Sequence, residues 1–231
     1  KMINVYKNVY AFITPSEFLK NKLALNGFEE KRIHCIPTFT ASKTTIGEQQ
    51  IGSYGLYFGR VTEEKGVETV IKAYEKLPEY TVKIMGDDTT DEAKRLKKYV
   101  ENHKMKNVEF LGFKSGEELE NVIKGARFTL IPSIWYDNLP NTALESFQYS
   151  KPVIASNIGS LPELVIDGEN GYLFKPSNVE DLIKKIKMLD DDTLVKKMGQ
   201  ASRKRLESRF APQTHYEELM KIFNEAVKSR K

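Results

Sequence analysis

The sequence predicts an α/β fold in which a parallel β-sheet is covered by helices on both faces. From residue 54 onward, six short and largely apolar segments alternate with amphipathic helical patterns. Strands that are apolar along their whole length are typical of sheets buried on both faces, and strand–helix alternation is typical of parallel sheets. We therefore expect a Rossmann-like domain.

The expected strands lie at 54–58, 81–85, 108–111, 128–131, 152–155 and 171–174. The helical patterns between them lie at 66–77, 91–103, 116–124, 140–149 and 161–166. Further helices are expected near 178–189, 193–209 and 212–230. Ahead of this alternation come a short strand at 10–14, a helix opened by Pro15 and Ser16 and stopped by Gly27, and an apolar run at 32–36. The polar segment 38–53 has no usable period and is interpreted as a linker.

The composition is that of an ordinary soluble globular protein, with 40% apolar and 29% charged residues in a chain of 231. No apolar run approaches the roughly 18 residues that span a bilayer, and no signal peptide is recognised. Cys35 lies in an apolar stretch and is interpreted as a buried thiol rather than a nucleophile. A single cysteine cannot form a disulfide within the chain. The three histidines are too scattered in the sequence to indicate a zinc site or a hydrolytic triad. We expect a cytoplasmic protein.

The net charge of +4 is unevenly distributed. Residues 184–231 hold 13 Lys or Arg against 7 Asp or Glu. This surplus indicates either a solvated helical face or weak attraction to an anionic glycan or to the inner face of a membrane. Aromatic side chains do not interleave with a basic stripe, so nucleic acid is not an expected partner.

Ligands bind at the carboxyl ends of the strands in such sheets, which makes the strand-to-helix turns the first candidates for a site. The turn after the strand at 54–58 contains Gly59, Arg60, Lys65 and Gly66. Two cations beside a helix N-terminus, where backbone amides lack partners, are suited to binding a diphosphate. Surface arginine and lysine are also common without any such role.

The turn after the strand at 128–131 leads into a helix that Pro140 can begin. The free amides of Asn141 and Thr142 would point at an anion. Glu145 shares their helix face and suits two vicinal ribose hydroxyls, and Asp137 on the loop can point into the same crevice. The alternative is that Asp137 caps the helix and Glu145 is solvated.

Two further features have simpler interpretations. After the strand at 152–155, Gly159 allows a close backbone approach and Glu163 begins a helix, where either residue can serve helix capping. The run of three aspartates at 190–192 lies at a helix–helix junction and is interpreted as a cap rather than a metal site.

The order and spacing of these motifs over nearly the whole chain resemble the C-terminal domain of the family-4 retaining glycosyltransferases, which have the two-domain GT-B fold. The resemblance implies that Gly59, Arg60, Lys65 and Gly66 bind the donor diphosphate. It also implies that Glu145 holds the ribose and that Asp137 touches the transferred sugar. Backbone contacts to phosphate and sugar are expected from Asn138, Leu139, Pro140, Asn141 and Thr142, and the base-binding edge from Gly112, Phe113 and Lys114.

Three positions depart from the pattern of that family. Asp137 stands where the family has glutamate, Ser150 where it usually has glycine before a Lys-Pro-Val-Ile run, and Asp88 where a second glycine usually follows Gly86 and Asp87.

The resemblance also implies a division of the chain. Residues 1–40 would be the end of an N-terminal acceptor domain, 41–210 the nucleotide-sugar-binding domain, and 211–231 a helix that crosses back. The rest of the acceptor domain would be missing, so we expect a donor-binding part that is inactive alone. A glycan or lipid-linked acceptor would bind through the missing domain.

The implied reaction transfers a sugar from a nucleoside diphosphate sugar with retention of configuration. Arg60, Lys65 and Asp137 are the expected catalytic residues. Charge that builds on the leaving phosphate would be stabilised by cations and helix amides, with no metal and no cofactor expected. The alternatives are a non-catalytic nucleotide-binding or interaction module and a sugar-nucleotide epimerase of similar fold.

Overall fold

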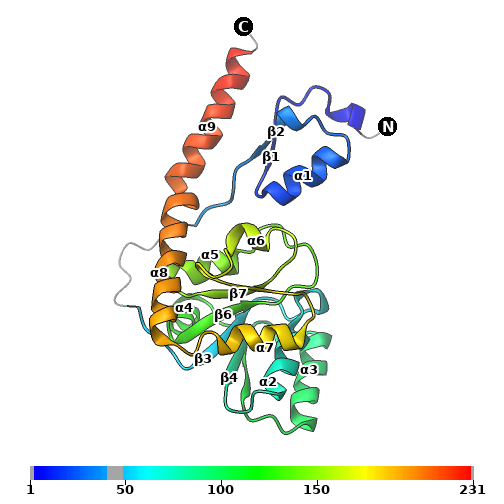
Figure 1. Cartoon of the computed structure of the whole chain (residues 1–231). Coiled ribbons are helices and arrows are strands. Elements are labelled where there is room, and N and C mark those ends of the chain that lie inside the picture. Colours follow the sequence, from blue (N-terminus) through cyan, green and yellow to red (C-terminus); the bar gives the residue numbers. More distant parts are fainter. Residues whose placement is uncertain (1–2, 41–48, 230–231) are drawn as a thin grey trace.

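The computed structural model describes residues 3–40 and 49–229, within which the strands form two parallel sheets (Figure 1). The larger sheet has six strands in the order β5-β4-β3-β6-β7-β8. Its strands are β3 (Tyr54–Phe58), β4 (Thr81–Met85), β5 (Val108–Gly112), β6 (Ala126–Ile131), β7 (Val153–Ser156) and β8 (Gly171–Phe174). The first strand, β3, lies in the middle, with β4 and β5 on one side and β6 to β8 on the other. This is the doubly wound, Rossmann-like order, which confirms the expected fold class.

Helices cover both faces of this sheet, as the apolar strands require. One face packs against α2 (Val67–Glu75), α3 (Asp91–Asn102) and α7 (Val179–Lys187). The other packs against α4 (Gly116–Lys124), α5 (Asn141–Gln148), α6 (Leu161–Leu164) and the C-terminal end of α8 (Asp192–Arg209). The N-terminal residues Val195 and Met198 of α8 belong to the first core. Successive strand residues alternate between the two cores, so Tyr57 belongs to the first and Leu56 and Phe58 to the second.

A second, smaller unit lies beside this domain. Its strands β1 (Phe12–Thr14) and β2 (Ile33–Cys35) pair in parallel, joined by α1 (Glu17–Leu25), and the short helices η1 (Ile3–Tyr6) and η2 (Glu30–Arg32) flank them. The Ser16 hydroxyl caps α1 by accepting from the Leu19 amide at 3.2 Å. We call residues 12–36 the small unit.

The last helix, α9 (Pro212–Lys228), extends away from the large sheet and runs alongside the small unit (Figure 1). Proline in its first turn suits a helix start, because the missing amide has no intrahelical partner there. His215 fixes its first turns through a contact of 2.7 Å between its Nδ1 and the Pro37 carbonyl oxygen. Tyr216, Phe223 and Val227 remain exposed on this helix.

Most element boundaries lie within two residues of those expected from the sequence; β6, for example, begins at Ala126 rather than at residue 128. The strand expected at 10–14 begins only at Phe12, and the helix expected at 161–166 is a single turn, α6. The expected linker at 38–53 lies partly outside the described residues, at 41–48. Within the described ranges, helices are too short or too polar to cross a bilayer.

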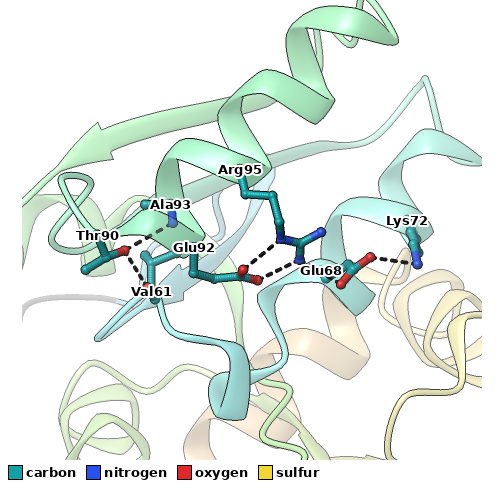
Figure 2. A network of polar contacts seen from close by, with 7 residues as sticks. All are labelled: Val61, Glu68, Lys72, Thr90, Glu92, Ala93 and Arg95. Carbon is teal, nitrogen blue, oxygen red and sulfur yellow. Dashed lines mark hydrogen bonds and ion pairs between the residues drawn. The ribbon is translucent and has the colours of Figure 1, made fainter.

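A polar network fixes the turn that follows β3 (Figure 2). Thr90 caps α3 and also donates its hydroxyl to the Val61 carbonyl at 2.7 Å. Arg95 of α3 then joins Glu92 and Glu68, each at 2.8 Å, and so ties α3 to α2. The chain segment that carries Arg60 is therefore held from the α3 side.

Candidate functional site

Two adjoining cavities open where the strand order diverges, at the carboxyl ends of β3 and β6. Their volumes are about 310 and 320 Å³. The residues that line both are Phe58, Gly59, Arg60, Thr142 and Glu145. The two cavities are therefore parts of one cleft at the topological switch point, where ligands of such sheets bind.

The turn after β3 forms one wall of the cleft, and its backbone depends on two glycines. Gly59 has a φ of 143° and Gly66 a φ of 66°, which side-chain-bearing residues rarely adopt. A Cβ at Gly66 would lie 2.1 Å from the Pro132 carbonyl oxygen, so this glycine lets the turn approach the end of β6. The buried Tyr57 hydroxyl donates to the Arg60 carbonyl and holds the turn from below.

The N-terminus of α5 forms the facing wall. The helix was expected to begin at Pro140, but Pro140 is its N-cap and α5 begins one residue later, at Asn141; no side chain caps the helix. Among the described residues no hydrogen bond is recorded from the amides of Asn141 and Thr142, both of which line the cleft. Two free amides and the positive end of a helix dipole are suited to an anion.

Glu145 lies one turn further along α5 and lines both cavities, so it stands between them. Burial raises the pKa of its carboxyl group above the usual 4.5. Among the residues described, no hydrogen bond or ion pair to this carboxylate is recorded. Glu145 is thus partly buried in the cleft rather than on an open face of the helix.

Asp137 does not cap α5, and its carboxylate is instead bonded on three sides. Lys65 donates to Oδ1 at 2.5 Å, Trp135 donates its ring N–H to the same oxygen at 3.2 Å, and Ser133 donates to Oδ2. The side chain of Asp137 is 11% exposed and that of Lys65 17% exposed. The structure thus joins these two residues, from different loops, into one ion pair at the far end of the cleft.

Arg60 is the most exposed cation of the cleft, with 69% of its side chain accessible. Its nearest recorded partner is Glu64, 3.8 Å away, which in this exposed setting leaves the guanidinium available to a ligand. Its position between the two cavities puts it opposite the α5 amides.

The second cavity is mostly apolar and reaches toward β4 and β5. Met85, Phe113 and Leu119 line it, with Asp87 and Lys114 at its polar margin. Phe113 is 73% exposed, so an aromatic face is open to a ligand there. Gly112 ends β5 with a φ of 67° and is not among the lining residues.

The third turn supports the loop after β6 from behind. Gly159 has a φ of 61°, and a Cβ there would lie 3.2 Å from the Asp137 carbonyl oxygen, which confirms the expected close approach. Ser160 donates its hydroxyl to that same carbonyl at 2.8 Å. The aspartate run caps α8, because Asp191 accepts from the amides of Thr193 and Leu194. That interpretation is confirmed.

Sequence reasoning missed several lining residues on the strands themselves: Tyr57, Phe58, Leu130, Ile131 and Met85. They are apolar strand residues whose pattern signals only burial. It also missed Ser133, because the loop is not helical and a spacing of four residues to Asp137 carries no signal there. Cys35 is half-buried and burial raises its pKa to about 12, which agrees with an unreactive thiol.

Comparison with known proteins decides the family. Residues 45–205 match the family model described as glycosyl transferases group 1. The chain belongs to this family. A glycosyltransferase of Methanocaldococcus jannaschii, MJ1178, is 30% identical over 190 residues, which cover 81% of this chain and 52% of that protein.

Solved structures show the same fold. A glycosyltransferase from Rickettsia africae superposes with a TM-score of 0.87 at 21% identity, covering 97% of this chain and 66% of that one. Anabaena HepE in complex with UDP superposes with a TM-score of 0.88 at 19% identity, covering 96% of this chain and 66% of that one. This group 1 chain therefore spans about half the length of the curated relative and just under two thirds of these structures.

Proposed function

We propose that this chain is the donor-binding part of a family-4 retaining glycosyltransferase and takes its sugar from a nucleoside diphosphate sugar. The single observation that carries the proposal is the position of Glu145 between the two cavities. It divides the cleft into an apolar end and a polar end. A nucleotide sugar is divided in the same way, with a flat base at one end and a diphosphate and sugar at the other.

Each part of the donor has a matching part of the cleft. The base fits the apolar cavity beside Phe113, and the ribose lies at Glu145, whose unbonded carboxylate can accept from two hydroxyls. The diphosphate then lies between Arg60 and the amides of Asn141 and Thr142.

The sugar would occupy the far end of the cleft, near Lys65 and Asp137. The negative charge that develops on the leaving diphosphate would be stabilised by Arg60 and the α5 amides, which are fixed before the reaction begins. Because Lys65 is paired with Asp137, its positive charge acts on the substrate together with that carboxylate. Retention of configuration rests on the resemblance to the family.

The acceptor is proposed to be a glycan or a lipid-linked glycan that binds outside this cleft, through a further domain of the protein. This chain alone would then bind the donor without transferring its sugar. A cytoplasmic site at the inner face of a membrane fits such acceptors and the basic residues of 184–231.

Isothermal titration calorimetry of this chain with UDP, GDP, ADP and UMP tests the proposal. We expect one nucleoside diphosphate to bind clearly better than its monophosphate. Arg60→Ala should weaken that binding about tenfold, the effect of one charge-assisted contact, and the loss should shrink as salt rises. Arg209→Ala is the matched control, because Arg209 is also a partly exposed arginine but pairs with Glu218 of α9, away from the cleft and from the turn after β3.

Equal binding of UDP and UMP, with no effect of Arg60→Ala, would contradict the diphosphate assignment. A nucleotide sugar that binds no better than its nucleoside diphosphate, in both the wild type and Asp137→Asn, would favour a nucleotide-binding module over a transferase.

A further inference from the structure

Glu163 of α6 binds the first turn of α1, although 146 residues separate the two contacting residues. Its Oε2 accepts from the Glu17 amide at 2.8 Å and its Oε1 from the Phe18 amide at 2.6 Å. These are the first two amides of α1, which have no partner within their own helix. A carboxylate of the large domain thus caps a helix of the small unit.

The same turn of α1 also contacts the loop that lines the cleft. Ser16 donates its hydroxyl to Oδ1 of Asn138 at 3.2 Å, and Asn138 lines the cavity at its polar end. The ring of Phe18 lies 5.0 Å from that of Tyr136, and the Lys22 ammonium lies over both rings.

The turn that carries Glu163 is itself packed on this loop. Gly159 approaches the backbone of Tyr136 and Asp137, and Ser160 donates to the Asp137 carbonyl. Arg205 of α8 donates to the carbonyl of Glu163 and fixes the turn from the other side. The 136–138 loop therefore lies between α6, which holds Glu163, and α1, which Glu163 holds.

We propose that Glu163 is a positioning residue that couples the small unit to the cleft. Glu163 holds the first turn of α1 against residues 136–138. A change in the order of that turn is therefore accompanied by a change in the geometry of the polar end of the cleft. Loss of this contact loosens the loop, and a ligand that orders the loop tightens α1.

Hydrogen exchange measured by mass spectrometry on the ligand-free chain tests this coupling. Glu163→Gln keeps the length of the side chain but removes its charge and turns an NH₂ group toward an amide N–H. Exchange in the first turn of α1 should become about tenfold faster, the loss of one charge-assisted hydrogen bond. Exchange in residues 136–142 should become about threefold faster at the same time. Glu163→Asp, which keeps the charge, should recover part of the protection in both segments.

Glu101→Gln is the matched control, because Glu101 is an exposed glutamate near the end of α3, away from both segments. It should change neither segment. If Glu163→Gln leaves α1 unchanged, the contact does not exist in solution. If it loosens α1 alone, Glu163 is a local cap and the coupling is wrong.

A second arm, with UDP, rests on the proposed function. UDP should slow exchange in the first turn of α1 in the wild type but not in Glu163→Gln, whose affinity for UDP should be about threefold weaker. Equal affinities for UDP overturn the coupling. If UDP does not bind even the wild type, UDP is not the ligand of the cleft, the other nucleotides decide the proposed function, and the ligand-free exchange alone decides the role of Glu163.

Discussion

Lys65 and Asp137 show how a single pair of side chains links two loops of the cleft. The pair is mostly buried, and the carboxylate has two further donors in Ser133 and Trp135. Removing one partner of such a pair leaves a charge without compensation, which costs more than the intact pair contributes.

We predict that Lys65→Met destabilises the fold by about 2 kcal/mol, less than for a fully buried pair because two other donors remain. Adding Asp137→Asn should recover much of that loss, since no unpaired charge then remains. Lys72→Met is the control, because Lys72 forms an exposed pair with Glu68 and should cost less than about 0.5 kcal/mol. Urea unfolding measures all three. Equal losses for Lys65→Met and Lys72→Met would refute the special status of the cleft pair.

The ionised carboxylate of Glu145 lowers the folding stability of the ligand-free protein. Its pKa is raised in the folded state, so between the unfolded and the folded pKa the folded state binds more protons and stability falls as pH rises. The cost is absent below the unfolded pKa and complete above the folded one.

We therefore predict that Glu145→Gln raises the melting temperature at pH 7 by about 1–2 °C and leaves it unchanged near pH 3.5. The same variant should bind a nucleoside diphosphate about tenfold more weakly, because the ribose loses a charged acceptor. Differential scanning calorimetry at the two pH values checks the melting temperatures, and titration calorimetry at pH 7 checks the binding. A variant that is less stable at pH 7 would show that the carboxylate has a partner in solution.

At the scale of elements, the end of α5 shows why the family usually has glycine at the position that Ser150 occupies in this chain. The Ser150 amide donates to the Phe147 carbonyl and the Lys151 amide to the Ser146 carbonyl, which together form a Schellman motif. Ser150 has a φ of 53°, the left-handed conformation that favours glycine.

Ser150→Gly should accordingly stabilise the fold by about 1 kcal/mol, or about 2–4 °C in melting temperature. The same exchange at Ser208, an exposed position inside α8, should destabilise it by about 0.5 kcal/mol, because the backbone there is helical. Differential scanning calorimetry of both variants measures whether the melting temperature rises for Ser150→Gly and falls for Ser208→Gly. A shared sign would mean that backbone conformation does not govern the effect.

Lys151 acts at the scale of the whole molecule. It is 1% exposed and donates to the carbonyls of Gln50, Lys124 and Ala126 at 2.6, 2.7 and 2.8 Å, so it joins the entry to the sheet, the end of α4 and the start of β6. Burial lowers its pKa to about 8 from the usual 10.5.

Lys151→Met should destabilise the fold by about 2–4 kcal/mol, because three buried carbonyls lose their donor. In the wild type the unfolded state binds more protons between pH 8 and 10.5, so Lys151 makes stability rise with pH in that window. Chemical unfolding at pH 7.5 and 9.5 should show that the free energy of unfolding rises more with pH in the wild type than in Lys151→Met. An unchanged free energy of unfolding at pH 7.5 would disprove the bridging role.

The sequence by itself determined the elements of this protein and the stretches of chain that line its cleft. Apolar runs and helical periods are local, so β3 and β4 were predicted to the residue, and Arg60, Asn141 and Glu145 were expected at the strand ends where they line one cavity. The tertiary structure decided which of these residues meet. The contact of Lys65 with Asp137 spans 72 residues and that of Glu163 with α1 spans 146, and no local pattern encodes such a distance. The first contact exists because strand order brings the carboxyl ends of β3 and β6 together, and the second because the small unit packs on the turn after β7. Both arrangements are set by packing of the whole chain.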